Sequence, residues 1–158
     1  DALALTLLNQ RGFTEEDFAR SHPSGNLGKR LLLRVMDVMH TGDKIPMVSS
    51  DVNLRDGLME MTKKGLGMTA VVSKENTLEG IFTDGDLRRN LDKGADIFKT
   101  KICDVMHKNC KTISANVLAT EALRLLEKNK ITSLLVVNEK NKLIGALNIH
   151  DLFREGLI

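Results

Sequence analysis

The sequence contains no tryptophan, no tyrosine and only five phenylalanines among its 158 residues. These phenylalanines do not cluster beside basic residues, so the sequence shows no platform on which nucleic acid bases would stack. The net charge is only +2, from 23 basic and 21 acidic side chains. A balance this close to zero gives no general attraction for a phosphate backbone. We therefore expect no nucleic acid partner.

Cysteines and long apolar runs are also scarce. The two cysteines, Cys103 and Cys110, are too few for a disulfide framework. The longest apolar runs, such as Leu134–Val137, fall far short of the roughly 20 residues that a membrane-spanning helix needs. No secretory signal is visible. The sequence thus predicts a cytoplasmic protein without a membrane partner.

The first 34 residues differ from the rest. Asp1 does not look like a natural start, and the apolar residues that follow it indicate a helix already under way. Thr14 and Asp17 fit the capping box of a second helix, and residues 21–28 are rich in small, turn-forming residues. We expect a piece of a longer protein, with a domain boundary near Arg34.

The remainder is an internal duplication, and a repeat of this kind fixes the architecture. Residues 48–89 match residues 113–154 without a gap, at an offset of 65 residues. Upstream of this match, Asp37–His40 recurs as Asp104–His107. Each copy is too small to close a core by itself, since domains of about 60 residues are marginal. We expect two related sheets that pack face to face, with a pair of equivalent clefts.

The residue pattern of each copy predicts a short strand, an amphipathic helix, a hairpin and a final helix. In the first copy the helix is favoured by apolar residues at helical spacing, with Asn53 as N-cap and Gly65 as its end. Two β-branched or apolar runs then flank a polar turn that contains Asn76, and Asn141 occupies the same place in the second copy. The final helices are expected to open at Asp84 and Ile149.

In both copies the last strand runs directly into the last helix, at Gly80–Leu87 and Gly145–Leu152. A helix start offers free N–H groups and partial positive charge, which suit a phosphate. The Thr83 hydroxyl can bind the same phosphate, and the Asp86 carboxylate can accept both hydroxyls of a ribose. Gly85 lets a ligand approach the backbone closely.

The same residues also fit a helix cap that needs no ligand. Thr83 with Asp86, and Asn148 with Asp151, are a capping residue followed by an acid at the third helical position. The motif alone leaves both interpretations open.

A strand that ends in Gly-x-x-Thr-x-x-Asp-Leu, on a tandem repeat of this size, resembles a pair of CBS domains, the regulatory module of the cystathionine β-synthase type. The resemblance covers residues 35–158 and implies an α/β (α+β) fold of two β-α-β-β-α units with pseudo-twofold symmetry. In that family this Thr and Asp bind phosphate and ribose, and the first strand supplies a wall against the base. The implied ligand-binding residues are Thr83, Asp86, Gly85, Ile45 and Pro46 in one site, and Asn148, Asp151 and Thr112 in the other.

The second copy departs from this pattern. It has Asn148 where the family usually has Thr, and His150 where the first copy has Gly85. We therefore expect the second site to bind more weakly than the first.

The segments Asp1–Ala4, Phe18–Pro23 and Phe82–Arg89 are together similar to bacterial D-arabinose 5-phosphate isomerases. Those enzymes join a sugar-isomerase (SIS) domain to a CBS pair and interconvert ribulose 5-phosphate and arabinose 5-phosphate for Kdo and lipopolysaccharide synthesis. The resemblance implies that residues 1–34 end the SIS domain, that 35–98 and 99–158 are the CBS domains, and that His22 contributes to the active site. It departs at Ser24, where the family usually has Gly.

This resemblance implies a regulatory nucleotide sensor, with AMP or ATP as the default ligand and CMP-Kdo, a later product of the pathway, as the second candidate. No cofactor is required, and the chain alone is expected to be inactive because the rest of the isomerase site lies upstream. CBS pairs commonly associate through their helices, so we expect a homo-oligomer that also contacts its own SIS domain. The alternative is a ligand-free oligomerisation domain.

Three further groups of residues carry weaker signals. Cys103, His107 and Cys110 offer only three zinc ligands and have no equivalent pair of cysteines in the first copy, so no metal site is expected. His40 and His107 occupy the same place in the two copies, which favours packing or capping. Arg88 and Arg89 fit either phosphate steering or a solvated helix face.

Overall fold

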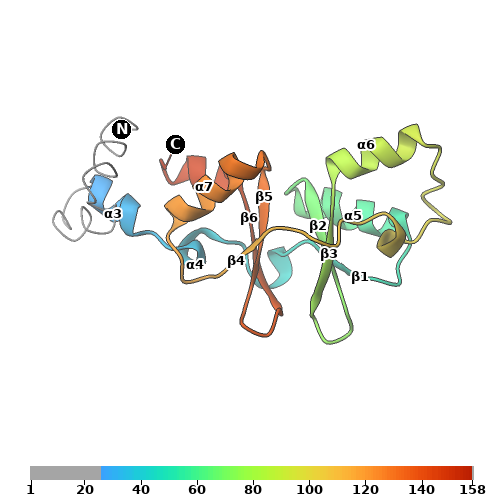
Figure 1. The fold of residues 1–158 in the computed structure, drawn as a ribbon, viewed down its shortest axis with the longest axis horizontal. Helices are drawn as coiled ribbons and strands as arrows, with labels where there is room; N and C mark the ends of the chain where they lie inside the picture. The colour runs from blue at the N-terminus through green and yellow to red at the C-terminus, as the bar shows by residue number, and fades with distance from the viewer. Residues whose placement is uncertain (1–25, 158) are drawn as a thin grey trace.

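The computed structural model describes residues 26–157, and it contains two β-α-β-β-α units that lie side by side (Figure 1). The predicted duplication and fold class are confirmed. The segment before the first unit forms the helices α3 (Asn26–Leu32) and α4 (Val35–Val38). The elements of the first unit are η1 (Gly42–Lys44), β1 (Met47–Ser49), α5 (Leu54–Lys64), β2 (Met68–Val72), β3 (Leu78–Thr83) and α6 (Asp84–Asp92). Those of the second are η2 (Ile102–Asp104), β4 (Thr112–Ile113), α7 (Ala119–Asn129), β5 (Ser133–Val137), β6 (Leu143–Asn148) and α8 (Ile149–Arg154).

Each unit contains a three-stranded sheet with the same connections. In the first, β1 pairs with β2 in parallel and β2 pairs with β3 as an antiparallel hairpin, and β4, β5 and β6 repeat this order. The hairpin turns place Asn76 and Asn141 at φ values of 64° and 59°. Asparagine adopts this left-handed conformation more readily than most residues. The predicted hairpins are therefore confirmed, turns included.

The helix ends also follow the sequence. The Asn53 side chain accepts a hydrogen bond from the Asp56 N–H at 3.0 Å, and Gly65 ends α5 in a left-handed conformation. The final helices begin at Asp84 and Ile149, as predicted. No helix within residues 26–157 is long and apolar enough to cross a membrane.

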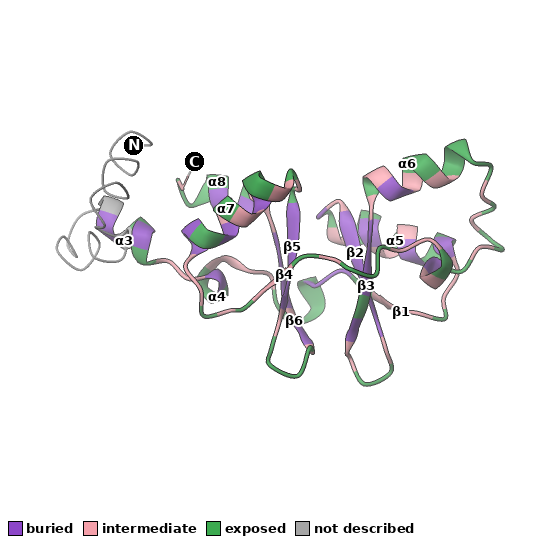
Figure 2. Ribbon diagram, in the orientation of Figure 1, coloured by how far each residue is buried: buried purple, intermediate pink, exposed green. Residues whose placement is uncertain are grey.

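The two sheets pack against each other through a shared apolar cluster. Met68, Ala70 and Ile81 of the first unit and Leu135 and Ala146 of the second all belong to it. The strands β2 and β5 are buried along most of their length, which Figure 2 shows in purple. The face-to-face packing predicted from the size of the repeat is thus present, since each sheet covers an apolar face of the other.

The segments before the first strands are exchanged between the units. The N–H of His40 donates to the carbonyl of Ala146 at 2.8 Å, and the N–H of His107 donates to the carbonyl of Ile81 at 2.9 Å. His40 therefore forms an isolated β-bridge to the second sheet, and His107 forms one to the first. The apolar cores follow the same exchange, because Val35 packs in the core of the second unit and Ile102 in that of the first. The boundaries 35–98 and 99–158 remain a prediction.

Two glycines allow this exchange. A Cβ atom on Gly80 would lie 2.8 Å from the carbonyl oxygen of His107 and 2.6 Å from the sulfur of Met106. A Cβ on Gly145 would lie 2.5 Å from the sulfur of Met39. Each glycine therefore keeps space for the segment that crosses from the other unit, which explains why both copies have one at this position.

Candidate functional site

A cleft of about 760 Å³ opens between the two units on the side where the final helices begin. Both units contribute to it, so the cleft exists only in the assembled pair. From the first unit it is lined by Gly65–Gly67, Ile81, Thr83–Gly85 and Arg89. From the second unit it is lined by His107, residues 109–111 and 130–133, Asn148 and His150.

The predicted site residues divide into two groups. Thr83, Gly85 and Asn148 line the cleft. The remaining predicted residues that the structure describes lie outside its lining, and they are Ile45, Pro46, Asp86, Thr112 and Asp151. Ile45 is a buried member of the apolar cluster between the sheets, to which Leu66 and Met68 also belong. His22 lies outside the described residues.

Asp86 lies outside the cleft lining, is 3% exposed, and four groups of the protein lie close to its carboxylate. Its Oδ2 accepts hydrogen bonds from the N–H of Thr83 at 2.9 Å and from the Thr83 hydroxyl at 3.0 Å. Its Oδ1 lies 2.6 Å from Nη2 of Arg89 and 2.8 Å from Nε2 of His107. The helix cap that the sequence allowed is therefore present, and a histidine from the exchanged segment completes it.

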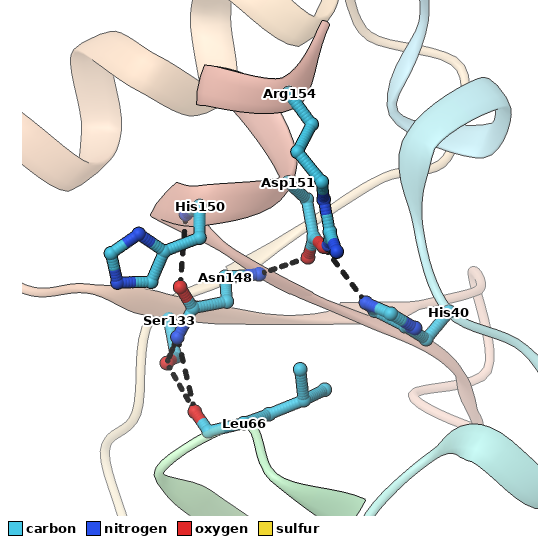
Figure 3. Close-up of polar contacts among 7 residues, drawn as sticks. All are labelled: His40, Leu66, Ser133, Asn148, His150, Asp151 and Arg154. Carbon is cyan, nitrogen blue, oxygen red and sulfur yellow. Dashed lines mark hydrogen bonds and ion pairs between the residues drawn. The ribbon is translucent and has the colours of Figure 1, made fainter.

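Asp151 repeats this arrangement in the second unit (Figure 3). Its Oδ2 accepts from the N–H of Asn148 at 2.8 Å, and its Oδ1 lies 2.9 Å from Nε2 of His40 and pairs with Arg154. The two histidines thus have equivalent roles, each across the boundary between units. The sequence favoured a packing or capping role for His40 and His107. The structure adds that each histidine contacts an aspartate, a partner that the sequence did not suggest.

Asn148 connects the two units directly. Its side-chain Nδ2 donates to the carbonyl of Leu66 at 3.1 Å and to the hydroxyl of Ser133 at 3.3 Å, as Figure 3 shows. Its Oδ1 accepts from the N–H of His150 at 2.9 Å. Thr83, at the equivalent place in the first unit, is too short to form such a bridge. The cleft is therefore asymmetric although the fold is repeated.

The backbone at the helix starts is partly engaged. The N–H of Asp84 donates to the carbonyl of Gly67 at 3.1 Å, and that of Asp86 donates to the Thr83 hydroxyl at 3.3 Å. In the second unit the N–H groups of Ile149 and His150 both have acceptors. Two of the first three N–H groups of α6 are thus already used, which limits what the helix start alone can offer a phosphate.

The charge of the cleft is mainly positive. Arg89, Lys111 and Lys130 line it, against one carboxylate, that of Asp84. Cys110 also contributes to the wall, and burial raises the pKa of its thiol above the ordinary value. The apolar wall of the cleft and its basic residues together suit a ligand with a flat organic part and an anionic part.

The CBS domain model matches residues 35–93 and 102–157. This chain belongs to the CBS domain family. The arabinose 5-phosphate isomerase KdsD of Pseudomonas aeruginosa is 55% identical over all 158 residues, which span 48% of that protein. The chain therefore covers about half the length of the curated relatives it matches. The resemblance to the CBS pair of these isomerases is confirmed.

Solved structures of CBS pairs share the fold. CBSX2 in complex with AMP aligns with a TM-score of 0.68 at 24% identity, over 79% of this chain and 96% of that one. The CBS pair of protein MJ0100 in complex with 5′-methylthioadenosine and S-adenosyl-L-methionine aligns with a TM-score of 0.70 at 19% identity, over 78% and 94%. At these identities the similarity establishes the CBS-pair fold.

The sequence missed some residues of the cleft in this CBS pair. Lys111 and Lys130 lie far from the Thr83 motif in sequence, and no local pattern marks them. His107 carried a signal in its recurrence at the position of His40, but its partner lies in the other unit. Within residues 26–157 no group of three His, Cys, Asp or Glu side chains is arranged to hold a metal ion.

Proposed function

We propose that this CBS pair is the nucleotide-sensing regulatory module of an arabinose 5-phosphate isomerase. The observation that carries the proposal is the cleft between the units, with Thr83 and Gly85 on one side and a basic rim of Arg89, Lys111 and Lys130. Its volume, about 760 Å³, falls within the range of about 300–1,000 Å³ typical of small-molecule sites. The ligand class is a phosphorylated ribonucleoside.

Two ligands deserve priority within this class. An adenine nucleotide is favoured by family, since the fold relatives CBSX2 and MJ0100 were solved with AMP and with adenosine derivatives. CMP-Kdo is the second candidate because it is a later product of the pathway. Control of an early isomerase by such a product would explain why a sensor is attached to that enzyme. Both present a ribose and a phosphate to the same cleft.

Isothermal titration calorimetry with AMP, ATP, CMP and CMP-Kdo tests the proposal. At least one ligand should bind with a Kd below about 1 mM, which corresponds to about 4 kcal/mol. Lys130→Glu, which reverses a charge on the cleft rim, should weaken that binding, whereas Lys128→Glu, on the same helix end but outside the cleft lining, should not. If no nucleotide binds the wild-type chain below millimolar concentration, the sensing function is wrong.

The catalytic function belongs, in this proposal, to the rest of the parent isomerase. Aldose–ketose isomerisation needs a bound sugar phosphate and a base close to the reacting carbons. Residues 1–34 would supply only the end of the SIS domain, with His22 as one contributor. The pure chain should therefore not turn over arabinose 5-phosphate, and measurable turnover would contradict this assignment.

Exposed apolar side chains support the alternative, a module that sets oligomeric state. Met59 on α5 and Phe98 are both exposed, and the guanidinium of Arg55 lies 6.0 Å from the centre of the Phe98 ring. Exposed large apolar side chains of this kind suit association with a second copy. Light scattering should give at least a dimer mass at micromolar concentration, and Met59→Lys should reduce it. A monomeric wild-type chain would remove this alternative.

A further inference from the structure

The Asp86 carboxylate is already engaged by groups of the protein. An ionised carboxylate accepts about four hydrogen bonds. Three are already made, two from Thr83 and one from Arg89, and Nε2 of His107 lies 2.8 Å from Oδ1. Asp86 must therefore release a partner before it can accept both hydroxyls of a ribose. Its 3% exposure and its place outside the cleft lining make this exchange costly.

The Thr83 hydroxyl is similarly committed. Because an ionised carboxylate can only accept, the contact of the hydroxyl with Asp86 must use the single hydroxyl hydrogen. The hydroxyl also accepts from the Asp86 N–H. It can receive a hydrogen bond from a ligand but has no hydrogen left to donate to a phosphate. The donors for an anionic group must therefore come from elsewhere in the cleft.

Arg89 and His107 can supply them. The side chain of Arg89 is 61% exposed and that of His107 is 63% exposed, although both contact the buried Oδ1 of Asp86. A guanidinium carries five N–H donors, of which the bond from Nη2 to Asp86 engages one, and Arg89 lines the cleft. Lys111, four residues after His107, lines the same cleft.

We propose that Arg89, His107 and Lys111 form the anion-binding subsite of the cleft, and that Asp86 is a positioning residue that orients Arg89 and His107 toward it. The inference rests on the proposed nucleotide-sensing function and names the residues that bind the phosphate. Arg89 belongs to the first copy of the repeat and His107 and Lys111 to the second, so the phosphate contacts residues of both copies. The role of Asp86 as a ribose ligand is the competing prediction.

The second unit does not reproduce this subsite. Arg154 occupies the place of Arg89 and pairs with Asp151, but it does not line the cleft. His40, the counterpart of His107, faces a separate hollow with Asp43, Lys44, Lys63 and Lys64. The subsite therefore occurs once in the cleft, on the side of Thr83.

Charge-neutral variants test the three donors against matched controls. Arg89→Gln and Lys111→Gln should each weaken binding of the best nucleotide by at least about tenfold, because a hydrogen bond to a charged group contributes about 1.5–3 kcal/mol and tenfold corresponds to about 1.4 kcal/mol. Arg88→Gln and Lys108→Gln change neighbouring exposed residues outside the cleft lining and should leave the Kd within about twofold. His107→Gln should also weaken nucleotide binding, as Arg89→Gln and Lys111→Gln do.

The nucleoside without its phosphate separates the two roles of Asp86. If Asp86 positions the phosphate donors, Asp86→Asn should weaken binding of the nucleotide and leave the affinity for the nucleoside unchanged. If Asp86 binds the ribose, both ligands should lose affinity equally, and the positioning role is wrong. Arg89→Gln and Lys111→Gln are exposed substitutions that keep the fold, so they decide the subsite even if Asp86→Asn unfolds. If both variants bind the nucleotide as tightly as the wild type does, the inference is wrong. If the wild type itself binds no nucleotide, the proposed function is wrong.

Discussion

Nε2 of His107 lies 2.8 Å from Oδ1 of Asp86, although the two residues belong to different copies of the repeat. Nε2 of His40 lies 2.9 Å from Oδ1 of Asp151 in the reciprocal direction. The pseudo-twofold axis relates the two contacts, so each unit holds the cap of the other unit's last helix. The contact between units thus includes the residues that border the cleft as well as the apolar cluster between the sheets.

A double-mutant cycle should detect this coupling between units. For His107→Gln with Asp86→Asn we expect a coupling free energy of about 0.5–1 kcal/mol, because the histidine side chain is largely exposed and solvent screens the contact. For His40→Gln with Asp151→Asn we expect a larger value, since the His40 side chain is only 25% exposed. Urea denaturation of the wild type, the two single variants and the double variant in each cycle measures it. Additive effects in both cycles would show that these contacts do not link the units.

Gly80→Ala should destabilise the pair. A new Cβ would lie 2.8 Å from the His107 carbonyl oxygen, and this backbone atom cannot move without shifting the exchanged segment. Overpacking of this kind costs about 1–3 kcal/mol. Gly85→Ala is the matched control for stability, because the nearest atoms to its Cβ belong to the flexible end of Arg89 at 3.4 Å. Equal denaturation midpoints for the two variants would contradict the assigned role of Gly80.

Asn148→Thr should weaken the contact between units while keeping the helix cap. Threonine can cap α8 through its hydroxyl, but it cannot reach the carbonyl of Leu66, to which Asn148 donates at 3.1 Å. The loss of one hydrogen bond corresponds to about 0.5–1.5 kcal/mol. Asn129→Thr is a comparison, since that side chain bonds only within its own helix, to the carbonyl of Leu125. An Asn148→Thr variant as stable as wild type would show that the bridge contributes nothing to stability.

Cys110 should report on occupancy of the cleft. Burial raises the pKa of its thiol, so at a given pH less of the reactive thiolate is present and alkylation should be slow. Its rate should rise as pH approaches the raised pKa, and it should rise on unfolding in urea. A nucleotide in the cleft should slow the reaction of Cys110 but leave that of Cys103, which lies outside the lining, unchanged. Mass spectrometry of each modified cysteine gives both rates, and equal protection of the two would rule out a local effect.

Much of the fold followed from the sequence because its signals are local. The helix starts at Asn53, Asp84 and Ile149 depend on residues within one turn, and the turns at Asn76 and Asn141 depend on residues that tolerate a positive φ. The duplication then extends each local signal to a second copy. Local propensity and repetition were sufficient to give both β-α-β-β-α units.

The exchange of segments was not predictable from these signals. Asp37–His40 and Asp104–His107 recur in the sequence, and this recurrence indicated equivalent roles, but it could not say in which unit each segment packs. That choice depends on apolar contacts and backbone hydrogen bonds between residues far apart in the chain, such as His40 with Ala146.

The sequence by itself determined the repeat, the order of its elements and the helix caps at Thr83 and Asn148, because capping and periodicity act over a few residues. Only the tertiary structure decided which side chains face the cleft. It placed Asp86 outside the cleft lining, with three hydrogen bonds and a close His107 contact at its carboxylate, and it brought Arg89 and Lys111 to one cleft from different copies of the repeat. The physical reason is that hydrogen-bond capacity and charge at a site depend on every group that packs there, and most of these groups are distant in sequence.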